Sequence, residues 1–256
     1  MSSDGPARWP HGYGLLRLKE TDSTNQEAAR QAGSAPGPTW IVADRQTKGR
    51  GRRGRAWSSP DGALLTTLLL RPDEDPATAA LRSFVTSVAL ADAFDSVGVP
   101  ADAIGLKWPN DVLLHGCKVA GILLESSGDA GRLSHLAIGI GINLTGEPDL
   151  SLVELGASPP ITLAQVLGRP VDRDDMLIAL AAAYAHREAQ FSDYGFGPIR
   201  EAWLARAARL GDVITARTLN DSHEGTFETV DPDGSLRLRT AHGHMVITAA
   251  DVFFHT

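Results

Sequence analysis

Three apolar segments in the middle of the chain constrain its fold most, because only short turns separate them. The segments span residues 112–114, 119–124 and 133–144, and the turns between them span 115–116 and 127–131. Turns this short join antiparallel strands, whereas parallel strands need a crossover of roughly a dozen residues. The sequence therefore predicts consecutive hairpins in a mixed or antiparallel sheet.

Other periodic segments surround these hairpins. Short apolar runs predict strands, and apolar residues recurring every three or four positions predict helices. We expect strands at 15–18, 40–43 and 63–70, and helices at 26–32, 76–97, 172–191 and 198–209. Residues 211–256 instead alternate over short segments with turns at 231–234 and 241–244, which is typical of a small all-β unit. We therefore predict an α/β fold of the α+β kind, with helices flanking the sheet, and two domains, 1–209 and 210–256.

Charge balance and cysteine content exclude several classes of function. The chain has 256 residues and a formal net charge of -7, whereas general nucleic-acid binders rely on basic surfaces that displace counterions. Its single cysteine, Cys117, excludes an intrachain disulfide and a thiolate-rich zinc site. No apolar run reaches the ~18 residues of a membrane span, and residues 1–12 lack a signal-peptide core. We expect a cytoplasmic protein with no membrane or DNA partner.

The segment GRGRRGRAW, residues 49–57, carries the strongest chemical signal, and we call it the arginine loop. Its three glycines let the backbone pass close to a ligand, and its four arginines offer planar donor forks suited to phosphate or carboxylate. The letters also fit G-x-G-x-x-G, but a dinucleotide fingerprint must open a helix directly. Ser58, Ser59 and Pro60 follow instead, before a predicted strand. We infer an anion-binding loop; a solvated basic surface loop is the alternative for the segment in isolation.

A second polar segment, KWPND at residues 107–111, is followed by KVAGI at 118–122. Asn110 and Asp111 favour a turn, and the hairpin can bring Lys118 back beside them. A lysine held there can present a compact positive charge to a buried oxyanion. A polar hairpin with an exposed lysine is the alternative interpretation.

Two weaker signals accompany these segments. The glycines of GIGIN at 139–143 leave room in an apolar strand for a ligand or another backbone. The segment DSTN at 22–25 suits a binding site but also an ordinary helix N-cap.

Taken in order, these five segments resemble the biotin protein ligases over roughly residues 15–145. The segments are 22–25, 46–57, 107–111, 118–122 and 139–143. The resemblance implies activation of biotin with ATP to biotinyl-5'-AMP, and transfer of biotin to a lysine of a biotin carboxyl carrier domain. It also implies a catalytic domain like the class II synthetase core, a small C-terminal SH3-like β-barrel, and Mg²⁺ at the ATP phosphates.

The resemblance further implies a role for each matching residue. Biotin would contact Ser23, Thr24, Asn25, Gln46, Arg50, Gly51, Arg52, Lys118 and Gly121. ATP would contact Arg52, Arg53, Arg55, Trp57, Lys107, Asn110, Lys118 and Asn143. Lys118 and Arg52 would stabilise the charge that develops on the α-phosphate. Asp111 would orient the acceptor lysine or take its proton. Metal ligands are left unassigned.

The resemblance indicates a monofunctional ligase, because about fourteen residues precede the first predicted strand, too few for a winged-helix DNA-binding domain. An exposed sheet edge would allow a homodimer. In the tail, residues 229–231 read TVD where relatives usually have GID, so no ligand contact is carried over from that domain.

Two alternatives remain. A lipoate protein ligase-like acyltransferase would share the sheet and the hairpin, but we would expect an Arg-Arg-x-Ser-Gly-Gly-Gly loop in place of residues 49–57. A non-catalytic biotin- or nucleotide-binding module is the other alternative, and the presence of both halves of a two-substrate site disfavours it.

Overall fold

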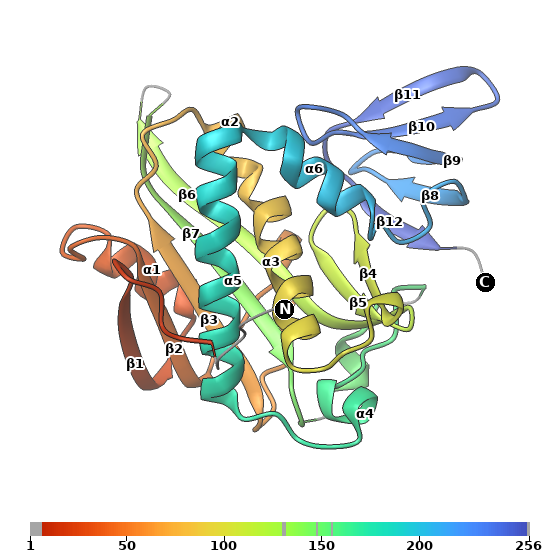
Figure 1. Ribbon diagram of the computed structural model, residues 1–256. Helices are drawn as coiled ribbons and strands as arrows, with labels where there is room; N and C mark the ends of the chain where they lie inside the picture. Colours follow the sequence, from red (N-terminus) through yellow and green to blue (C-terminus); the bar gives the residue numbers. More distant parts are fainter. Residues whose placement is uncertain (1–6, 130–131, 147, 155, 255–256) are drawn as a thin grey trace, which may run out of the picture.

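The structure is a computed structural model that describes residues 7–129, 132–146, 148–154 and 156–254. Figure 1 shows a large sheet crossed by helices, with a smaller sheet to one side. In chain order, the strands of the large sheet are β1 (Gly14–Thr21), β2 (Thr39–Gln46), β3 (Ala63–Leu70), β4 (Ile104–Lys107), β5 (Asp111–Leu114), β6 (Cys117–Asp129) and β7 (Arg132–Asn143). Their spatial order is β1-β2-β3-β7-β6-β5-β4, and only β1 and β2 run parallel. The predicted mixed sheet is confirmed.

The predicted hairpins are also confirmed, because β5, β6 and β7 are consecutive antiparallel neighbours. Their first turn places His115 and Gly116 in the left-handed region, at φ of 49° and 80°, as two-residue hairpins require. The sequence analysis misses β4, since four residues are too few to display a strand periodicity. Pairing with β5 and backbone hydrogen bonds to residues 206 and 208 place β4 at the sheet edge.

Helices cover both faces of the large sheet. They are α1 (Thr24–Gln31), α2 (Pro76–Ala80), α3 (Arg82–Ser96), α4 (Leu163–Leu167), α5 (Arg173–Tyr194) and α6 (Phe196–Leu204). In Figure 1, α3 and α5 stand in front of the sheet. Alternate residues of β2 face opposite sides: Trp40 and Val42 join the main core with α3 and α5, whereas Ile41 packs with Ala28 of α1. Because both faces are covered, every residue of β3 is buried.

The four predicted helices differ from the observed ones by up to five residues at their ends, and one of them is divided in two. The helix expected over 76–97 is divided at Leu81, where three-residue hydrogen bonds tighten the turn between α2 and α3. The helix expected over 198–209 begins two residues earlier and ends at Leu204, because the following turn bonds to Leu106 of β4.

The smaller sheet contains β8 (Val213–Arg217), β9 (Ser222–Val230), β10 (Leu236–Thr240), β11 (Gly243–Ile247) and β12 (Asp251–Phe254). It is antiparallel, in the order β11-β10-β9-β8-β12. The expected SH3-like barrel is not closed, since β11 and β12 form opposite edges and do not pair over the described residues. The Ala250 carbonyl, at the start of β12, accepts a hydrogen bond from Arg52 rather than from β11.

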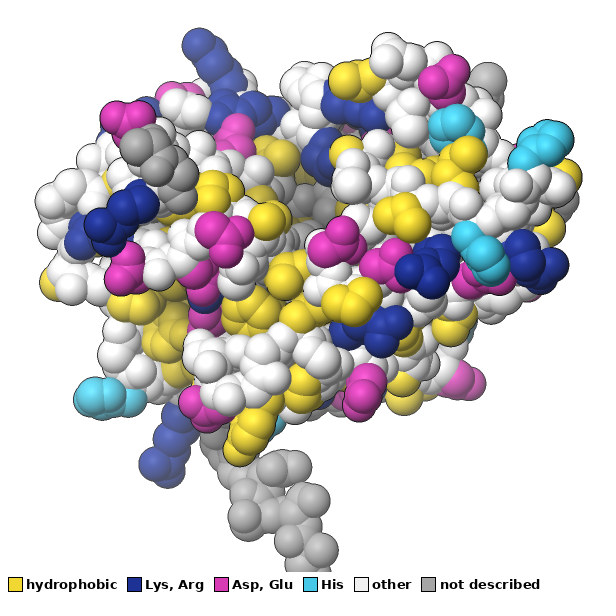
Figure 2. Space-filling view, turned by 90° about the horizontal axis from the view of Figure 1, so that it is seen from above, with side chains coloured by type: hydrophobic (Ala, Val, Ile, Leu, Met, Phe, Trp, Pro, Cys, Tyr) yellow, Lys and Arg dark blue, Asp and Glu magenta, His cyan; other side chains and the backbone are white. Residues whose placement is uncertain are grey.

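The described surface agrees with the charge argument. In Figure 2, acidic and basic side chains alternate over the visible face, and no continuous basic area spans it. Within the described ranges, the helices are too short or too polar to cross a bilayer.

Candidate active site

Most of the predicted site residues meet in one cleft above β6 and β7. From the predicted set, its lining includes Ser23, Thr24, Asn25, Gln46, Arg50, Gly51, Arg52, Arg55, Trp57, Asn110, Asp111, Lys118, Gly121 and Asn143. Arg53 and Lys107 lie outside that lining. Lys107 is buried, its Nζ donates to Ser158 Oγ at 3.2 Å, and burial lowers its pKa. Segments far apart in the sequence thus converge on one site.

One part of the cleft lining is a neutral wall formed by Ser23, Thr24, Asn25 and Gln46, and the buried Thr67 bonds to two of these residues. Gln46 Oε1 accepts hydrogen bonds from Thr24 N at 2.7 Å and from Thr24 Oγ1 at 3.0 Å. Thr67 Oγ1 lies 2.7 Å from both Thr24 Oγ1 and Asn25 Oδ1. Ser23 occupies the N-cap position of α1, but its side chain makes no capping hydrogen bond. These groups therefore form a wall rather than a plain helix cap.

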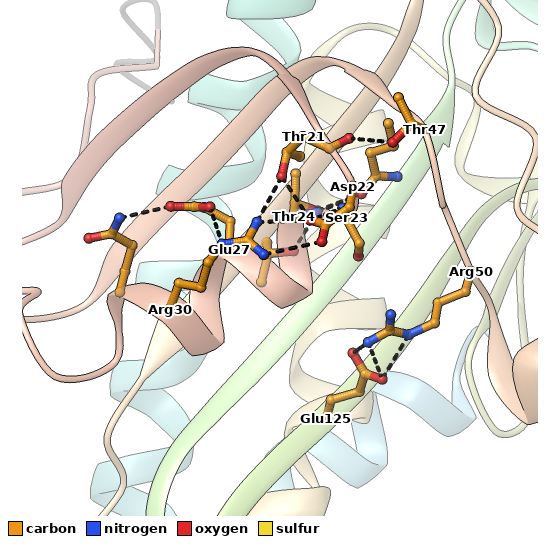
Figure 3. A network of polar contacts seen from close by, with 12 residues as sticks. Thr21, Asp22, Ser23, Thr24, Glu27, Arg30, Thr47, Arg50 and Glu125 are labelled. Carbon is orange, nitrogen blue, oxygen red and sulfur yellow. Dashed lines mark hydrogen bonds and ion pairs between the residues drawn. The ribbon is translucent and has the colours of Figure 1, made fainter.

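A charged cluster supports the wall from outside (Figure 3). Arg30 donates to both carboxylate oxygens of Asp22 and to Glu27. These hydrogen bonds, together with the Ser23 N–H that also donates to Asp22, hold the pKa of Asp22 well below its ordinary value. The start of α1 is therefore tied to the strand that leads into it.

The arginine loop folds as a small hairpin, with an isolated bridge between Arg50 and Ala56. Its tip places Arg53 and Gly54 at φ of 55° and 72°, a region that glycine adopts without strain. The loop ends with the Trp57 ring lying on β6 and β7. A Cβ atom at Gly141 would lie 2.5 Å from the Trp57 ring, and one at Gly121 would lie 3.0 Å from it. The strand glycines thus make room for the indole.

Carboxylates from distant segments hold the arginines of the loop. Asp251 of β12 pairs with Arg52 at 3.3 Å, Arg53 at 3.0 Å and Arg55 at 2.6 Å, and its own side chain is 11% exposed. Burial lowers the pKa of Arg52. Glu125 of β6 binds Arg50 through both carboxylate oxygens.

Asp251 and Glu125 lie outside the motifs that predicted the site. The available signal was the excess of arginine in one short segment, because partly buried guanidinium groups need anionic partners.

The hairpin brings Lys118 and Asp111 together, with Nζ 2.6 Å from Oδ1. Lys118 Nζ also lies 5.3 Å from the centroid of the Trp57 ring. Asn110 Nδ2 donates to the Ile122 carbonyl at 2.6 Å, and Asn143 Nδ2 lies 3.3 Å from the Lys118 carbonyl. Lys118 is therefore held in the cleft beside Asp111 and the Trp57 ring of the arginine loop.

Carboxylates in the cleft do not gather into a metal site. Over the described residues, no group of three or more His, Cys, Asp or Glu side chains could hold an ion. Asp111 is paired with Lys118, and Asp251 with three arginines. The described side chains by themselves therefore form no cluster of three or more such ligands for Mg²⁺.

Comparisons with known proteins agree with this arrangement. The family model described as "Biotin/lipoate A/B protein ligase family" matches residues 17–143, and that described as "Biotin protein ligase C terminal domain" matches residues 210–255. The chain is 51% identical to the biotin--[acetyl-CoA-carboxylase] ligase of Paracoccus denitrificans, over 93% of this chain and 99% of that protein. It is 34% identical to the bifunctional ligase/repressor BirA of Bacillus subtilis (strain 168), over 92% of this chain and 71% of that protein.

Solved structures of biotin protein ligases also resemble this chain. The biotin protein ligase from Aquifex aeolicus in complex with biotin and ATP has a TM-score of 0.77 and 28% sequence identity. The match covers 93% of this chain and 97% of that one. The likeness therefore extends over both sheets.

Proposed function

This chain belongs to the biotin protein ligases of the biotin/lipoate A/B protein ligase family, and from that premise we propose how its cleft performs the reaction. Biotin is activated with ATP to biotinyl-5'-AMP, and biotin is then transferred to a lysine of the carboxylase carrier domain. One observation carries the assignment of the site: a neutral hydrogen-bonding wall, a cationic loop and Lys118 line the same cleft. That arrangement suits a reaction in which the carboxylate of biotin approaches the triphosphate of ATP.

We assign the ureido ring of biotin to the neutral wall. Gln46 Oε1 is occupied by Thr24, and over the described residues neither Gln46 Nε2 nor Ser23 Oγ has a hydrogen-bond partner. Two free polar groups beside a buried wall can pair with a neutral ring that both accepts and donates. Such placed partners discriminate between ligands more sharply than apolar contact does. The amide hydrogens of Asn25 are instead directed to Leu123 and Glu125.

We assign to Lys118 and Arg52 the stabilisation of negative charge in the first step. An oxygen of the biotin carboxylate attacks the α-phosphorus, and the bond from that phosphorus to the oxygen of the leaving pyrophosphate breaks. Two anions approach each other, so fixed positive charge at the phosphoryl oxygens lowers the barrier. Arg53, Arg55, Trp57, Lys107, Asn110 and Asn143 remain our predicted ATP contacts, and Gly51 and Gly121 our predicted close approaches to biotin.

Asp111 is assigned to the second step. The nitrogen of the acceptor lysine attacks the acyl carbon of the mixed anhydride, AMP leaves, and the nitrogen must lose a proton. Asp111 is the carboxylate next to Lys118, with 2.6 Å between Oδ1 and Nζ. It can therefore orient the incoming amine or accept its proton.

We further propose a division of the chain into a catalytic domain, 1–209, and a C-terminal domain, 210–256, which contributes Asp251 to the site. Mg²⁺ would arrive with the phosphates of ATP. The absence of a DNA partner, a cytoplasmic location and homodimer formation stay predictions.

The direct test is incubation of the chain with labelled biotin, ATP and a biotin carboxyl carrier domain. We expect label on the carrier, dependent on ATP, and pyrophosphate release dependent on biotin. A parallel reaction supplies lipoate and a lipoyl acceptor domain. Label on the lipoyl acceptor alone would overturn the assignment in favour of the lipoate alternative, and binding of biotin without pyrophosphate release would favour the non-catalytic module.

A further inference from the structure

We propose that Glu125 is a positioning residue of this reaction, which orients Arg50 and joins the arginine loop to the neutral wall that receives biotin. This inference rests on the proposed function of the cleft. Glu125 lies on β6, and no motif of the sequence analysis includes it. Its carboxylate accepts hydrogen bonds from a residue of the loop, Arg50, and from a residue of the wall, Asn25, and so bridges the two.

The contacts of Glu125 are directional on both sides. Arg50 Nε donates to Oε1 at 3.1 Å, and Arg50 Nη2 donates to both oxygens at 3.0 Å (Figure 3). Asn25 Nδ2 donates to Oε2 at 2.9 Å. Two parallel bonds from a planar guanidinium fix its plane as well as its position. Glu125 therefore sets the orientation of two side chains at once.

A count of donors identifies what this leaves for a ligand. A guanidinium carries five N–H groups, one on Nε and two on each terminal nitrogen. Glu125 engages Nε and Nη2 of Arg50, and within the described chain Nη1 has no hydrogen-bond partner. Arg50 is part of the cleft lining. Glu125 thus holds Arg50 so that one nitrogen stays available to biotin.

Glu125 is also the end of a continuous polar chain. It contacts Asn25, whose Oδ1 lies 2.7 Å from Thr67 Oγ1, and Thr67 in turn lies 2.7 Å from Thr24 Oγ1. Thr24 donates to Gln46 at the far end of the wall. Asn25, Thr24 and Thr67 are at most 4% exposed. A buried polar group that loses its hydrogen-bond partner costs free energy. Displacement of Arg50 should therefore disturb the hydrogen bonds along the wall.

Loss of the Glu125 side chain should weaken the use of biotin rather than the use of ATP. The arginines of the loop that are predicted to meet the phosphates, Arg52, Arg53 and Arg55, are held by Asp251 and make no contact with Glu125. Removal of Glu125 frees Arg50 and leaves one hydrogen of Asn25 unpaired, while the Asp251 cluster stays intact. A residue that merely stabilised the fold would weaken the use of both substrates.

Steady-state kinetics of adenylate formation, measured by pyrophosphate release, test this proposal. Glu125→Ala should raise the KM for biotin by about tenfold or more, the effect of losing a charged hydrogen bond, and change the KM for ATP by less than about twofold. Glu125→Gln, which keeps shape but sets one amide against that of Asn25, should fall between Ala and wild type. Glu20→Ala is the matched control, since Glu20 forms an exposed ion pair with Arg45 outside the cleft.

A double-mutant cycle with Arg50→Ala separates a positioning role from an independent one. If Glu125 acts through Arg50, Glu125→Ala should add less than about twofold to the biotin KM of Arg50→Ala. Multiplicative effects, an unchanged biotin KM, or equal rises for both substrates would overturn the proposal. If Glu125→Ala fails to fold, as judged by thermal unfolding, the same comparisons are made with Glu125→Gln. A wild-type chain without adenylate formation would refute the proposed function itself.

Discussion

The neutral wall and the arginine loop, which both line the cleft, differ in charge and in exposure to solvent. The neutral wall consists of uncharged side chains, and Ser23, Thr24 and Asn25 are 3–4% exposed. The arginine loop consists of cations whose side chains, at Arg52, Arg53 and Arg55, are 25–43% exposed. The wall is fixed by hydrogen bonds between adjacent strands and α1, whereas the loop is fixed by ion pairs with carboxylates that come from elsewhere in the chain.

The difference explains how one site can select its ligand at the wall and still rearrange its charged loop. Buried hydrogen bonds are costly to leave unpaired, so the wall should accept only a ring that satisfies it. Partly exposed ion pairs are worth little individually and are screened by salt. The partly exposed arginines of the loop can therefore turn from Asp251 to the phosphates of a ligand, although Asp251, at 11% exposed, then loses its partners at a cost in free energy.

The largest effect is expected at Lys118, which lines the cleft together with the wall and the loop. Lys118→Ala should lower the rate of adenylate formation by ~10²–10³, as loss of one preorganised donor at a developing oxyanion does. Pyrophosphate release in a single turnover measures it. Lys19→Ala, on the exposed side of β1, is the control. Near-normal pyrophosphate release would remove Lys118 from the reaction.

The next largest effect is expected in the neutral wall. Gln46→Leu keeps the size of the side chain but removes the acceptor for Thr24 and the free amide donor, so kcat/KM for biotin should fall by roughly 10²-fold. Titration of biotin at saturating ATP measures the change. Gln190→Leu on α5, whose native partner is Arg187, serves as control. A value within about twofold of wild type would contradict the assignment of this wall to the ureido ring.

A smaller effect is expected in the loop. Arg52→Gly removes an ion pair with Asp251 and a donor to the Ala250 carbonyl. We expect biotinyl-5'-AMP to leave the site about tenfold faster, since a charged hydrogen bond contributes on the order of 1.5 kcal/mol. Release of the labelled intermediate into filtrate is the measurement. Arg8→Gly, at an exposed position, is the control; unchanged release would count against clamping by Arg52.

The response to salt should distinguish the wall from the loop directly. Between roughly 0.05 and 0.5 M KCl the Debye length falls about threefold, so the KM for ATP should rise several-fold. The KM for biotin should change by less than about twofold, because its wall is buried and neutral. Initial rates at matched ionic strengths provide both values. Equal salt dependence of the two KM values would contradict the assignment of biotin to a neutral wall and of ATP to a charged loop.

The smallest effect is expected at the support of the wall. Hydrogen bonds from Arg30 and Ser23 lower the pKa of Asp22 from its ordinary value of 3.8. Its contribution to stability is therefore present above about pH 4 and is lost as the pH falls through the lowered pKa. The side chain is 39% exposed, so the contribution is small. Asp22→Asn should unfold with a shallower dependence on acid pH, which urea titrations between pH 5 and 2 would measure.

Much of the fold follows from local pattern. The hairpins of β5, β6 and β7 and the long helices α3 and α5 are evident from turn residues and apolar spacing. β4 and the division of the helix at Leu81 are not, because four residues carry no period and a tightened turn keeps the apolar spacing intact. The open C-terminal sheet was not evident either, since closure depends on whether β11 meets β12 and not on either strand alone.

The chemistry of the site follows from the amino-acid sequence, because residue types and their order fix which donors and acceptors the chain can bring to a ligand. How those groups are used depends on the folded arrangement. It paired the arginine loop with Asp251, some 200 residues away, and with Glu125, and it left Gln46 Nε2 and Arg50 Nη1 free while engaging Asn25 fully. The physical reason is that hydrogen bonds and ion pairs form between neighbours in space, and sheet order places neighbours that are distant in sequence.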